Sequence, residues 1–391
     1  MSSRIEVDYQ FPAGTDAGRQ ACILAVGQTT GSWDIRYAHR EAELHGHLGE
    51  VLRLEQRDDG SSLATVGYPL GNVDGRLGSL LTMILGKFSM AGPARVVELR
   101  LPEGYGQAAK FGLAGIRRHL DIRDRPLFMA IFKPALGLDA GDHARILAEV
   151  SQAGLDIIKD DEILPNLAAA PTLERWRACA PVLEERRCRS GRDMLYAVNL
   201  SGDARQVHSL ARQLVLEGAN ALLLNVLAYG FPVLEALAAD PEISVPIFAH
   251  PALAGALAGS RAHGFSYPVL LGTLMAHAGA DAVLYPAHYG SLPITAGEEN
   301  GVAAALRTRG VAPVPSAGVH PGILSAILKD YGEEVILNAG TGIMDHPDGA
   351  AAGVQAFHEA YACWQRGEVP EAGHLPDGPL RRAMEKWGGV Q

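Results

Sequence analysis

The sequence predicts an α/β fold in which a (β/α)8 TIM barrel follows a smaller α+β domain of the ferredoxin-like type. Eight short apolar runs recur from about residue 125 onward, at the spacing of one helix plus one strand. Amphipathic segments separate these runs, and this alternation is typical of a parallel sheet covered by helices. The first 120 residues lack such alternation. A doubly wound open sheet is the alternative architecture, but eight consecutive units favour the barrel.

A separate N-terminal α+β domain is expected over residues 1–120. Several apolar stretches in it resemble strands, and one longer stretch resembles a helix. The expected strands are RIEVDYQF (4–11), ACILAVG (21–27), GEVLRLEQ (49–56), LATVGYPL (63–70) and ARVVELRLP (94–102), and the expected helix is RLGSLLTMILG (76–86).

The barrel is expected over residues 121–391, with a helical tail at its C-terminal end. Helix-like segments include 143–154, 207–220 and 323–332, and the glycines near the ends of the last two fit a helix C-cap. The eight expected strands are LFMAIF (127–132), LDII (155–158), MLYAV (194–198), ALLLN (221–225), VPIFA (245–249), DAVLY (281–285), VAPVP (311–315) and VILNA (335–339).

Composition excludes several classes of function. The chain of 391 residues is 48% apolar and carries a formal charge of −10 without a basic cluster, so we expect neither nucleic acid nor an anionic membrane as a partner. Apolar runs stay shorter than the roughly 18 residues of a membrane span, and the N-terminus lacks the apolar core of a signal peptide. The four cysteines lack CxxC spacing, which favours a cytoplasmic protein with reduced thiols.

Polar side chains and glycine turns follow the expected strands in an unusually regular way. Active sites of TIM barrels lie at the C-terminal ends of the strands, so these residues are expected to converge. They are Lys133, then Lys159 with Asp161 and Glu162, then Asn199, Asn225, His250, His288 on a loop, and the turns SAG (316–318) and AGTG (339–342).

The stretch GLDIIKDDEIL (154–164) combines one lysine with three carboxylates at a strand end. Asp161 and Glu162 are hard oxygen donors that suit Mg²⁺. Lys159 would repel the metal as an ammonium, but a carbamate formed with CO₂ would be a third anionic ligand. The alternative is an ordinary salt bridge between lysine and aspartate. Asp160 is left without a role, and we expect it to face away.

Lysine is rare in this chain, because only six of the 34 basic residues are lysine. Lys133 lies in an apolar flank that would suit a general base, and a phosphate-binding cation is the alternative. His250 is expected either to contact substrate or to be an internal hydrogen-bonded histidine. The turns SAGVHPG (316–322) and NAGTG (338–342) are placed where barrels commonly bind phosphate, although plain strand–helix connections also use glycine.

These motifs, in this order, resemble the RuBisCO superfamily over nearly the whole chain. They are KPALGL, GLDIIKDDE, HPALAG, SAGVHPG and GIMDHPDG. The resemblance implies a carbamylated Lys159, with Asp161 and Glu162 as further ligands of one Mg²⁺ per subunit. It also implies that Lys133 and His250 lie at the substrate, and that Ser316, Gly318, Gly340 and Thr341 belong to the turns that bind substrate and phosphate. TTGSW (29–33), with Trp33, looks like the segment that completes the neighbouring subunit's site, which implies a homodimer.

Departures from the family pattern argue against a CO₂-fixing carboxylase. The second lysine of strand one is replaced by Ala135, and the arginine after the strand-five histidine is replaced by Pro251. The loop AHYGSLPITAGEEN (287–300) also lacks the mobile-loop lysine. RuBisCO-like proteins remain, and LGKFSMAG (85–92), YAVNLSG (196–202) and VPSAGVHPG (314–322) look very like the 2,3-diketo-5-methylthiopentyl-1-phosphate enolases of methionine salvage.

That resemblance implies an isomerase that enolises a methylthio-pentulose 1-phosphate, with Lys87 as general base. PALGL (134–138) and PAHYGS (286–291) differ from the enolase pattern, however. They favour the alternative of a 5-methylthioribulose-1-phosphate isomerase, in which His288 would be an additional polar group. Decarboxylation of a β-keto acid sugar phosphate and a non-catalytic regulatory role are further alternatives.

Overall fold

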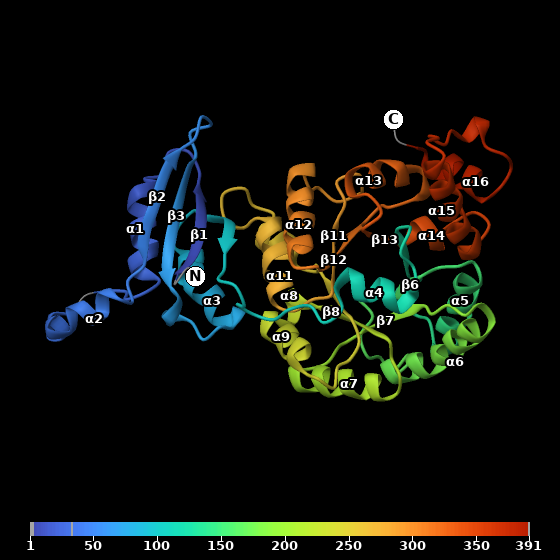
Figure 1. The fold of residues 1–391 in the computed structure, drawn as a ribbon, viewed down its shortest axis with the longest axis horizontal. Helices are drawn as coiled ribbons and strands as arrows, with labels where there is room; N and C mark the ends of the chain where they lie inside the picture. The colour runs from blue at the N-terminus through green and yellow to red at the C-terminus, as the bar shows by residue number, and fades with distance from the viewer. Residues whose placement is uncertain (1–3, 33, 390–391) are drawn as a thin grey trace.

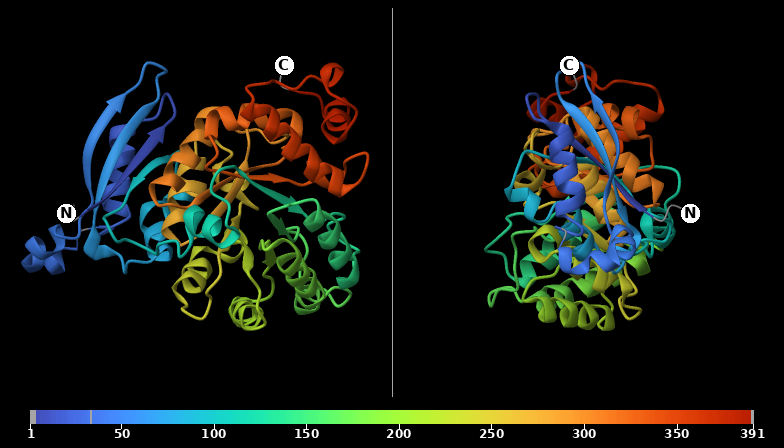
Figure 2. Two further views of the ribbon diagram at one scale, coloured as in Figure 1. Left: turned by 45° about the vertical axis from the view of Figure 1, so that its right-hand side comes forward. Right: turned by 90° about the vertical axis from the view of Figure 1, so that its left-hand side faces the viewer.

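The computed structural model describes residues 4–32 and 34–389. Its N-terminal domain is a twisted antiparallel sheet that lies beside a larger barrel (Figure 1). Turned views show that helices surround the barrel, whereas one face of the small sheet carries helix α1 (Figure 2). The predicted α/β class, with a barrel after a smaller α+β domain, is confirmed.

Apart from the short helix α2 between α1 and β2, the N-terminal domain has the element order βαββαβ, which is that of a ferredoxin-like fold. Its four strands pair antiparallel in the order β4-β1-β3-β2, and the short strand β10 of the barrel chain extends this sheet beside β4. The main elements are β1 (Arg4–Phe11), α1 (Ala17–Gly27), α2 (Glu41–His45), β2 (Glu50–Gln56), β3 (Ser62–Pro69), α3 (Leu77–Ile84), β4 (Arg95–Arg100) and β10 (Gly264–Phe265), with a 3₁₀ turn over Lys87–Met90.

The strand expected over 21–27 was wrong, because these residues form the second half of helix α1. The Asp16 side chain caps the helix by accepting a hydrogen bond from the N–H of Arg19. Buried positions at Ala17, Ala21, Leu24 and Ala25 then follow the helical period. A short apolar run cannot by itself distinguish a strand from a buried helix segment.

All eight predicted barrel strands are present and parallel. They follow the order β12-β11-β9-β8-β7-β6-β5-β13, and at the two ends of this order the Asn338 side chain of β13 donates a hydrogen bond to the Ser316 hydroxyl of β12. The strands are β5 (Leu127–Ile131), β6 (Ile157–Lys159), β7 (Leu195–Asn199), β8 (Ala221–Asn225), β9 (Ile247–His250), β11 (Ala282–Pro286), β12 (Ala312–Ser316) and β13 (Ile336–Ala339).

Alternate residues of each strand serve two different cores. Ile157 of β6 belongs to the cluster inside the barrel, whereas Ile158 packs in the layer between strands and helices. Helix α4 (Gly112–Leu120) contributes Ile116 and Leu120 to the interior cluster. The boundary after residue 120 stays a prediction, and this packing of α4 favours a boundary before residue 112.

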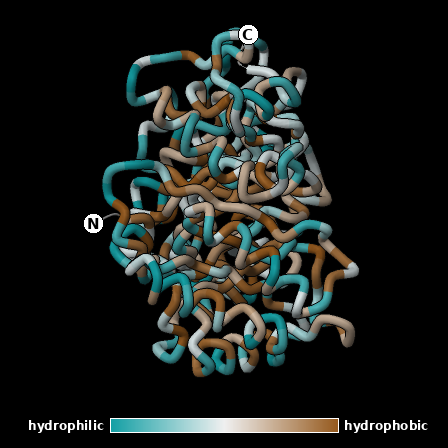
Figure 3. The backbone as a smooth tube through the Cα atoms, turned by 90° about the vertical axis from the view of Figure 1, so that its right-hand side faces the viewer, coloured by the Kyte–Doolittle hydropathy of each residue, from teal (hydrophilic) through white to brown (hydrophobic). Residues whose placement is uncertain are grey.

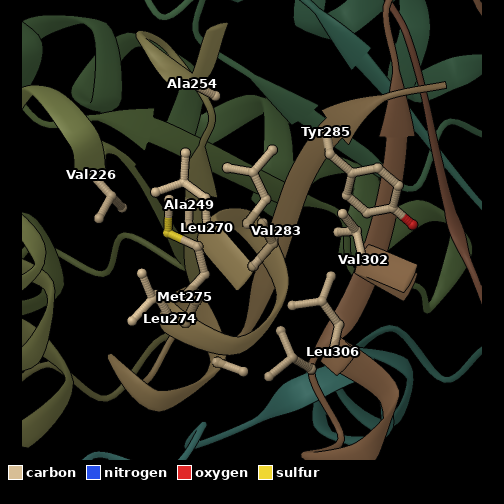
Figure 4. Close-up of a cluster of buried hydrophobic side chains, with 14 of the residues drawn as sticks. Val226, Ala249, Ala254, Leu270, Leu274, Met275, Val283, Tyr285, Val302 and Leu306 are labelled. Carbon is tan, nitrogen blue, oxygen red and sulfur yellow. The ribbon is translucent and has the colours of Figure 1, made fainter. Parts of the chain in front are cut away.

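The outer layer consists of helices that pack on the strands. Figure 4 shows part of it, where Leu270, Met275 and Leu306 belong to the same buried cluster as Val283 of β11. Apolar stretches run through the middle of the molecule, and hydrophilic ones lie on its outside (Figure 3). The barrel helices are α5 (Ala140–Gln152), α6 (Thr172–Ser190), α7 (Ala204–Leu216), α8 (Val226–Tyr229), α9 (Phe231–Ala239), α10 (Ala254–Ala258), α11 (Met275–His277), α12 (Ala296–Thr308) and α13 (Leu324–Tyr331).

The last described part of the chain contains three helices. They are α14 (Thr341–Met344), α15 (Ala350–Gln365) and α16 (Pro379–Trp387). Within residues 4–32 and 34–389, we find no helix that is both long and apolar enough to span a bilayer.

Candidate active site

The alternation along each strand carries the predicted site residues to the mouth of the barrel. Lys159 lies two positions after Ile157, whose side chain belongs to the interior cluster, so both side chains point inward. The same two-residue step places three further side chains at the same mouth: Asn199, Asn225 and His250. Their positions therefore follow from strand register as well as from strand order.

Lys159 is completely buried. Its Nζ donates to Oε2 of Glu162 and to the backbone carbonyl of Asp160, each at 3.1 Å. Burial lowers the pKa of Lys159, and the nearby carboxylates, Glu162 first among them, oppose that shift. Lys159 thus forms an ion pair with Glu162, whereas the alternative drawn from the sequence was a salt bridge with an aspartate.

Glu162 also contacts His250, whose Nε2 lies 3.3 Å from Oε2 of the carboxylate. Burial alone would raise the pKa of Glu162, but Lys159 and His250 outweigh it and lower this pKa to about 2. Burial, together with the charge of Lys159, lowers the pKa of His250 to about 3. His250 is therefore neutral at pH 7, and its Nδ1 accepts a hydrogen bond from the N–H of Ala252.

Lys133 joins the same group from the loop after β5. Its Nζ donates to Oδ2 of Asp161 at 2.6 Å, and the aspartate side chain is almost fully buried. Lys133, Lys159, Asp161, Glu162 and His250 thus form one polar cluster at the mouth of the barrel. We call it the KDE cluster below.

Asp160 points away from the KDE cluster, as expected. It is buried on the outer side of β6, where it accepts hydrogen bonds from Tyr196 at 2.7 Å and from Arg175 at 3.1 Å. The backbone N–H of Asn199 donates to the same carboxylate at 2.9 Å. Arg175 is itself fully buried, so Asp160 neutralises a guanidinium inside the protein.

The donor set of the KDE cluster fits Mg²⁺ if Lys159 carries a carbamate. In the part of the chain that the structure describes, no three His, Cys, Asp or Glu side chains lie together as a metal site. Asp161 and Glu162 thus provide two carboxylates, and a third anionic ligand is needed. A carbamate on the buried Lys159 would supply it. The buried Oδ1 atoms of Asn199 and Asn225 lack hydrogen-bond partners among the described residues and are further oxygen donors at this mouth.

The two glycine turns lie beside each other at the ends of β12 and β13. Ser316 approaches Asn338, and Gly318 has a left-handed φ of 92° that favours glycine. Gly340 and Thr341 follow β13 directly, at the start of α14. The turn after β12 also pairs with the loop after β11, because the N–H of Ser291 donates to the carbonyl of Ala317 at 3.1 Å.

A cavity of about 780 Å³ adjoins the KDE cluster at His250. Pro251 stands in its wall, and Arg95 is neutralised there by an ion pair with Glu298. Arg261 is a second cation at its edge. Most of the remaining wall is apolar: Ala252, Leu253, Ala254, Ala258, Leu292, Pro293 and Ile294.

Lys87 lies apart from the KDE cluster within one chain. It lines a separate cavity of about 1100 Å³ in the N-terminal domain, together with Thr29, Thr30 and Ser32 of the TTGSW segment. Trp33 of that segment lies outside the described residues. The two cavities share no lining residue, so the structure does not bring Lys87 to the cavity beside His250 within one chain.

His288 is bound by a buried glutamate. Both its backbone N–H and its Nδ1 contact Oε2 of Glu299, and Tyr331 donates to Oε1 of the same carboxylate. Sequence reasoning missed Glu299, Arg175 and Asn338. Only Asn338 carried a usable signal, because it lies two positions after the inward-facing Ile336 of the strand VILNA.

Comparison with known proteins agrees with this architecture. The sequence model described as "Ribulose bisphosphate carboxylase large chain, catalytic domain" matches residues 112–292 and 303–387. The chain belongs to the RuBisCO family. Among RuBisCO-family relatives, a 2,3-diketo-5-methylthiopentyl-1-phosphate enolase of Microcystis aeruginosa is 57% identical over 384 residues, which cover 98% of this chain and 100% of the relative. An enolase of the same name from Exiguobacterium sibiricum is 38% identical, with 98% of each chain covered.

Solved RuBisCO-family structures match along the whole length. The rubisco-like protein MtnW of Alicyclobacillus acidocaldarius superposes with a TM-score of 0.89 at 38% identity, covering 99% of each chain. The dimeric archaeal Rubisco of Hyperthermus butylicus has a TM-score of 0.87 at 24% identity, covering 99% of this chain and 96% of the other. At that identity, the second match supports the fold alone.

Proposed function

We propose that this RuBisCO-family protein is a Mg²⁺-dependent 2,3-diketo-5-methylthiopentyl-1-phosphate enolase of methionine salvage, located in the cytoplasm. The reaction is an intramolecular proton transfer from a carbon beside a carbonyl group to the carbonyl oxygen. The observation that carries the proposal is the KDE cluster, in which a fully buried Lys159 lies between the carboxylates of a strand end. The name of the full-length relatives supports the choice of reaction.

Lys159 as a carbamate, Asp161 and Glu162 would hold the Mg²⁺. When bound, the metal supplies positive charge beside the substrate oxygens as the enolate develops. Lys133 lies within hydrogen-bond distance of Asp161, and we assign it to orienting the substrate oxygens. His250 lines the wall between the cluster and the cavity, and we assign it to contacting the substrate.

The two ends of the substrate would bind on opposite sides of the KDE cluster. The phosphate is assigned to the turns that contain Ser316, Gly318, Gly340 and Thr341, where the N–H of Gly318 meets no acceptor among the described residues. The methylthio end is assigned to the apolar cavity beside His250. Pro251 in its wall favours a thioether over a second phosphate.

A carboxylase is disfavoured by the missing lysines. Ala135 is a small apolar side chain in the loop after β5, and the segment from residue 160 to residue 328 contains no lysine. The isomerase alternative drew on the additional His288. Since Glu299 holds His288 through both the backbone N–H and Nδ1, we assign His288 to the loop rather than to the substrate.

Lys87 is proposed as the general base, acting in the KDE cluster of a partner subunit within a homodimer. Its own cavity in the N-terminal domain is open and large enough to receive part of another subunit. Neither Lys87 nor Thr29 lines the cavity beside His250 in the same chain. A second copy of the chain would bring its Lys87 to the KDE cluster of the first.

The reaction is tested by incubating the protein with the diketo phosphate, Mg²⁺ and bicarbonate while following the ultraviolet absorbance of the enol. We expect an enol signal from the wild type and none from Lys159→Ala or Lys87→Ala. Lys329→Ala is the matched control, because Lys329 lies on the outer helix α13. An unchanged absorbance at high enzyme concentration would refute the proposal.

The isomerase alternative is separated by a second substrate. The protein is incubated with 5-methylthioribulose 1-phosphate in D₂O, and exchange of carbon-bound protons is followed by NMR. Enolase activity predicts no isomerised product from this compound, whereas deuterium incorporation with product formation would favour the isomerase.

A further inference from the structure

A third cavity, which is polar and has a volume of about 570 Å³, lies at the end of the barrel opposite the KDE cluster. Its residues come before the strands rather than after them: Arg125 precedes β5, Asp156 precedes β6 and Arg192 precedes β7. The C-terminal end of α6 completes the wall with Arg186 and Arg189. No residue of this cavity belongs to the site proposed for the reaction.

The charge of this cavity is strongly one-sided. Four arginines and a single carboxylate line it. The carboxylate is already used, because Asp156 accepts two hydrogen bonds from Arg125, at 2.6 and 2.7 Å, and one from the N–H of Phe128 at 2.9 Å. Three guanidinium charges are therefore left without a carboxylate in a chain whose formal charge is −10.

Arg186, Arg189 and Arg192 have no ion-pair partner among the described residues, whereas Arg125 is paired with Asp156. Arg186 is buried, and its Nη1 donates to the carbonyls of Ser151 and Leu155, which fix it in the cavity floor. Arg189 and Arg192 are exposed at the rim. Burial lowers the pKa of Arg186, the charge of Asp156 opposes this shift, and the like charges of Arg125, Arg192 and Arg189 add to it.

We propose that this cavity binds a small anion that carries two or three linked phosphate groups. Guanidinium groups match phosphate oxygens through paired, charge-assisted hydrogen bonds. Several phosphates in a small volume would neutralise the charge of Arg186, Arg189 and Arg192 together. The volume lies within the range of pockets that hold compact ligands. A nucleoside diphosphate and inorganic pyrophosphate share this chemistry.

Calorimetric titration of the full-length protein with inorganic pyrophosphate tests the site. The R189A/R192A variant should bind about a hundredfold more weakly than the wild type, since it loses two charged hydrogen-bonding groups. R187A/R205A is the matched control, because both of these arginines are exposed and lie outside the cavity; it should bind like the wild type. R189K/R192K should recover part of the affinity by restoring charge alone.

Each outcome decides the proposal. Unchanged pyrophosphate binding by R189A/R192A, with a melting temperature equal to that of the wild type, would place the anion elsewhere and overturn it. Equal affinities for orthophosphate and pyrophosphate would overturn the assignment to linked phosphates. Tighter binding of adenosine diphosphate than of pyrophosphate, lost in R189A/R192A, would identify the ligand as a nucleotide within the proposed class.

Discussion

At the scale of single residues, the segment Lys159–Asp160–Asp161 places neighbouring side chains in different environments. Lys159 and Asp161 belong to the KDE cluster, whereas Asp160 faces the helix layer and meets Arg175. Successive side chains of a strand point to opposite faces, so neighbouring acids acquire unrelated partners. Asp161 is therefore available to bind the metal, whereas Asp160 stabilises the fold.

Asp160→Ala should lower the free energy of unfolding by about 3–5 kcal/mol, because it leaves the buried Arg175 without its carboxylate. Tyr196→Phe removes only one hydrogen bond to Asp160 and should cost about 1 kcal/mol. Urea unfolding, followed by fluorescence, measures both. A loss for Asp160→Ala no larger than that of Tyr196→Phe would contradict the role given to the pair.

Glu162→Gln should abolish stabilisation by Mg²⁺. A ligand that binds only the folded state raises the melting temperature by mass action, so wild type in bicarbonate should melt higher with Mg²⁺ than with a chelator. Glu185→Gln, an exposed change on α6, should respond like the wild type. If Glu162→Gln kept the full Mg²⁺-dependent shift in a thermal melt, Glu162 would not be a ligand.

At the scale of elements, the loop between β11 and α12 is held at its start and in its middle. Its start is held by Glu299 through His288, and its middle is held by the carbonyl of Ala317 through the N–H of Ser291. Gly290 permits this contact, because a Cβ there would lie 1.7 Å from the carbonyl oxygen of Ala317. The loop thereby covers the turn after β12, to which we assign the phosphate.

Glu299→Gln should free this loop. The amide cannot accept from both His288 and Tyr331 as the carboxylate does, and the loss should be about 1–3 kcal/mol. Chymotrypsin should then cleave faster at Tyr289 or Leu292, as mass spectrometry of the fragments would establish. Asn300→Asp, an exposed change on the same helix, should leave cleavage unchanged. Identical cleavage rates for Glu299→Gln and wild type would argue against the anchoring role.

At the scale of the whole molecule, the two domains present complementary halves of one proposed site. The barrel holds the KDE cluster, and the N-terminal domain holds Lys87 in a different cavity of the same chain. In a two-fold symmetric dimer, Lys87 of each subunit would meet the KDE cluster of the other, so each dimer would contain two complete sites. Assembly, on this proposal, is a condition of activity.

Co-expressed Lys87→Ala and Lys159→Ala subunits test that arrangement. Each variant alone should be inactive, but a random mixture should recover about a quarter of wild-type activity, because half of its dimers contain one intact site. Doubly tagged heterodimers, purified and assayed, sharpen the measurement. Inactive heterodimers would mean that both lysines serve the same subunit, and full activity of a monomer in light scattering would refute the dimer.

The sequence by itself determined the eight parallel strands, because each is a short and almost wholly apolar run between amphipathic segments. It also placed Lys159, Asp161, Glu162 and His250 at one mouth, since strand ends converge in a barrel. Helix α1 escaped prediction because a short apolar run has no unambiguous period.

Only the tertiary structure decided which partners these residues have. Arg175 lies 15 positions beyond Asp160, and Glu299 meets Tyr331 from another helix, so neither contact leaves a local pattern. The separation of Lys87 from the KDE cluster, and the uncompensated arginines at the opposite end of the barrel, likewise depend on how distant segments pack. Periodicity sets the direction of a side chain, but long-range packing selects what it meets.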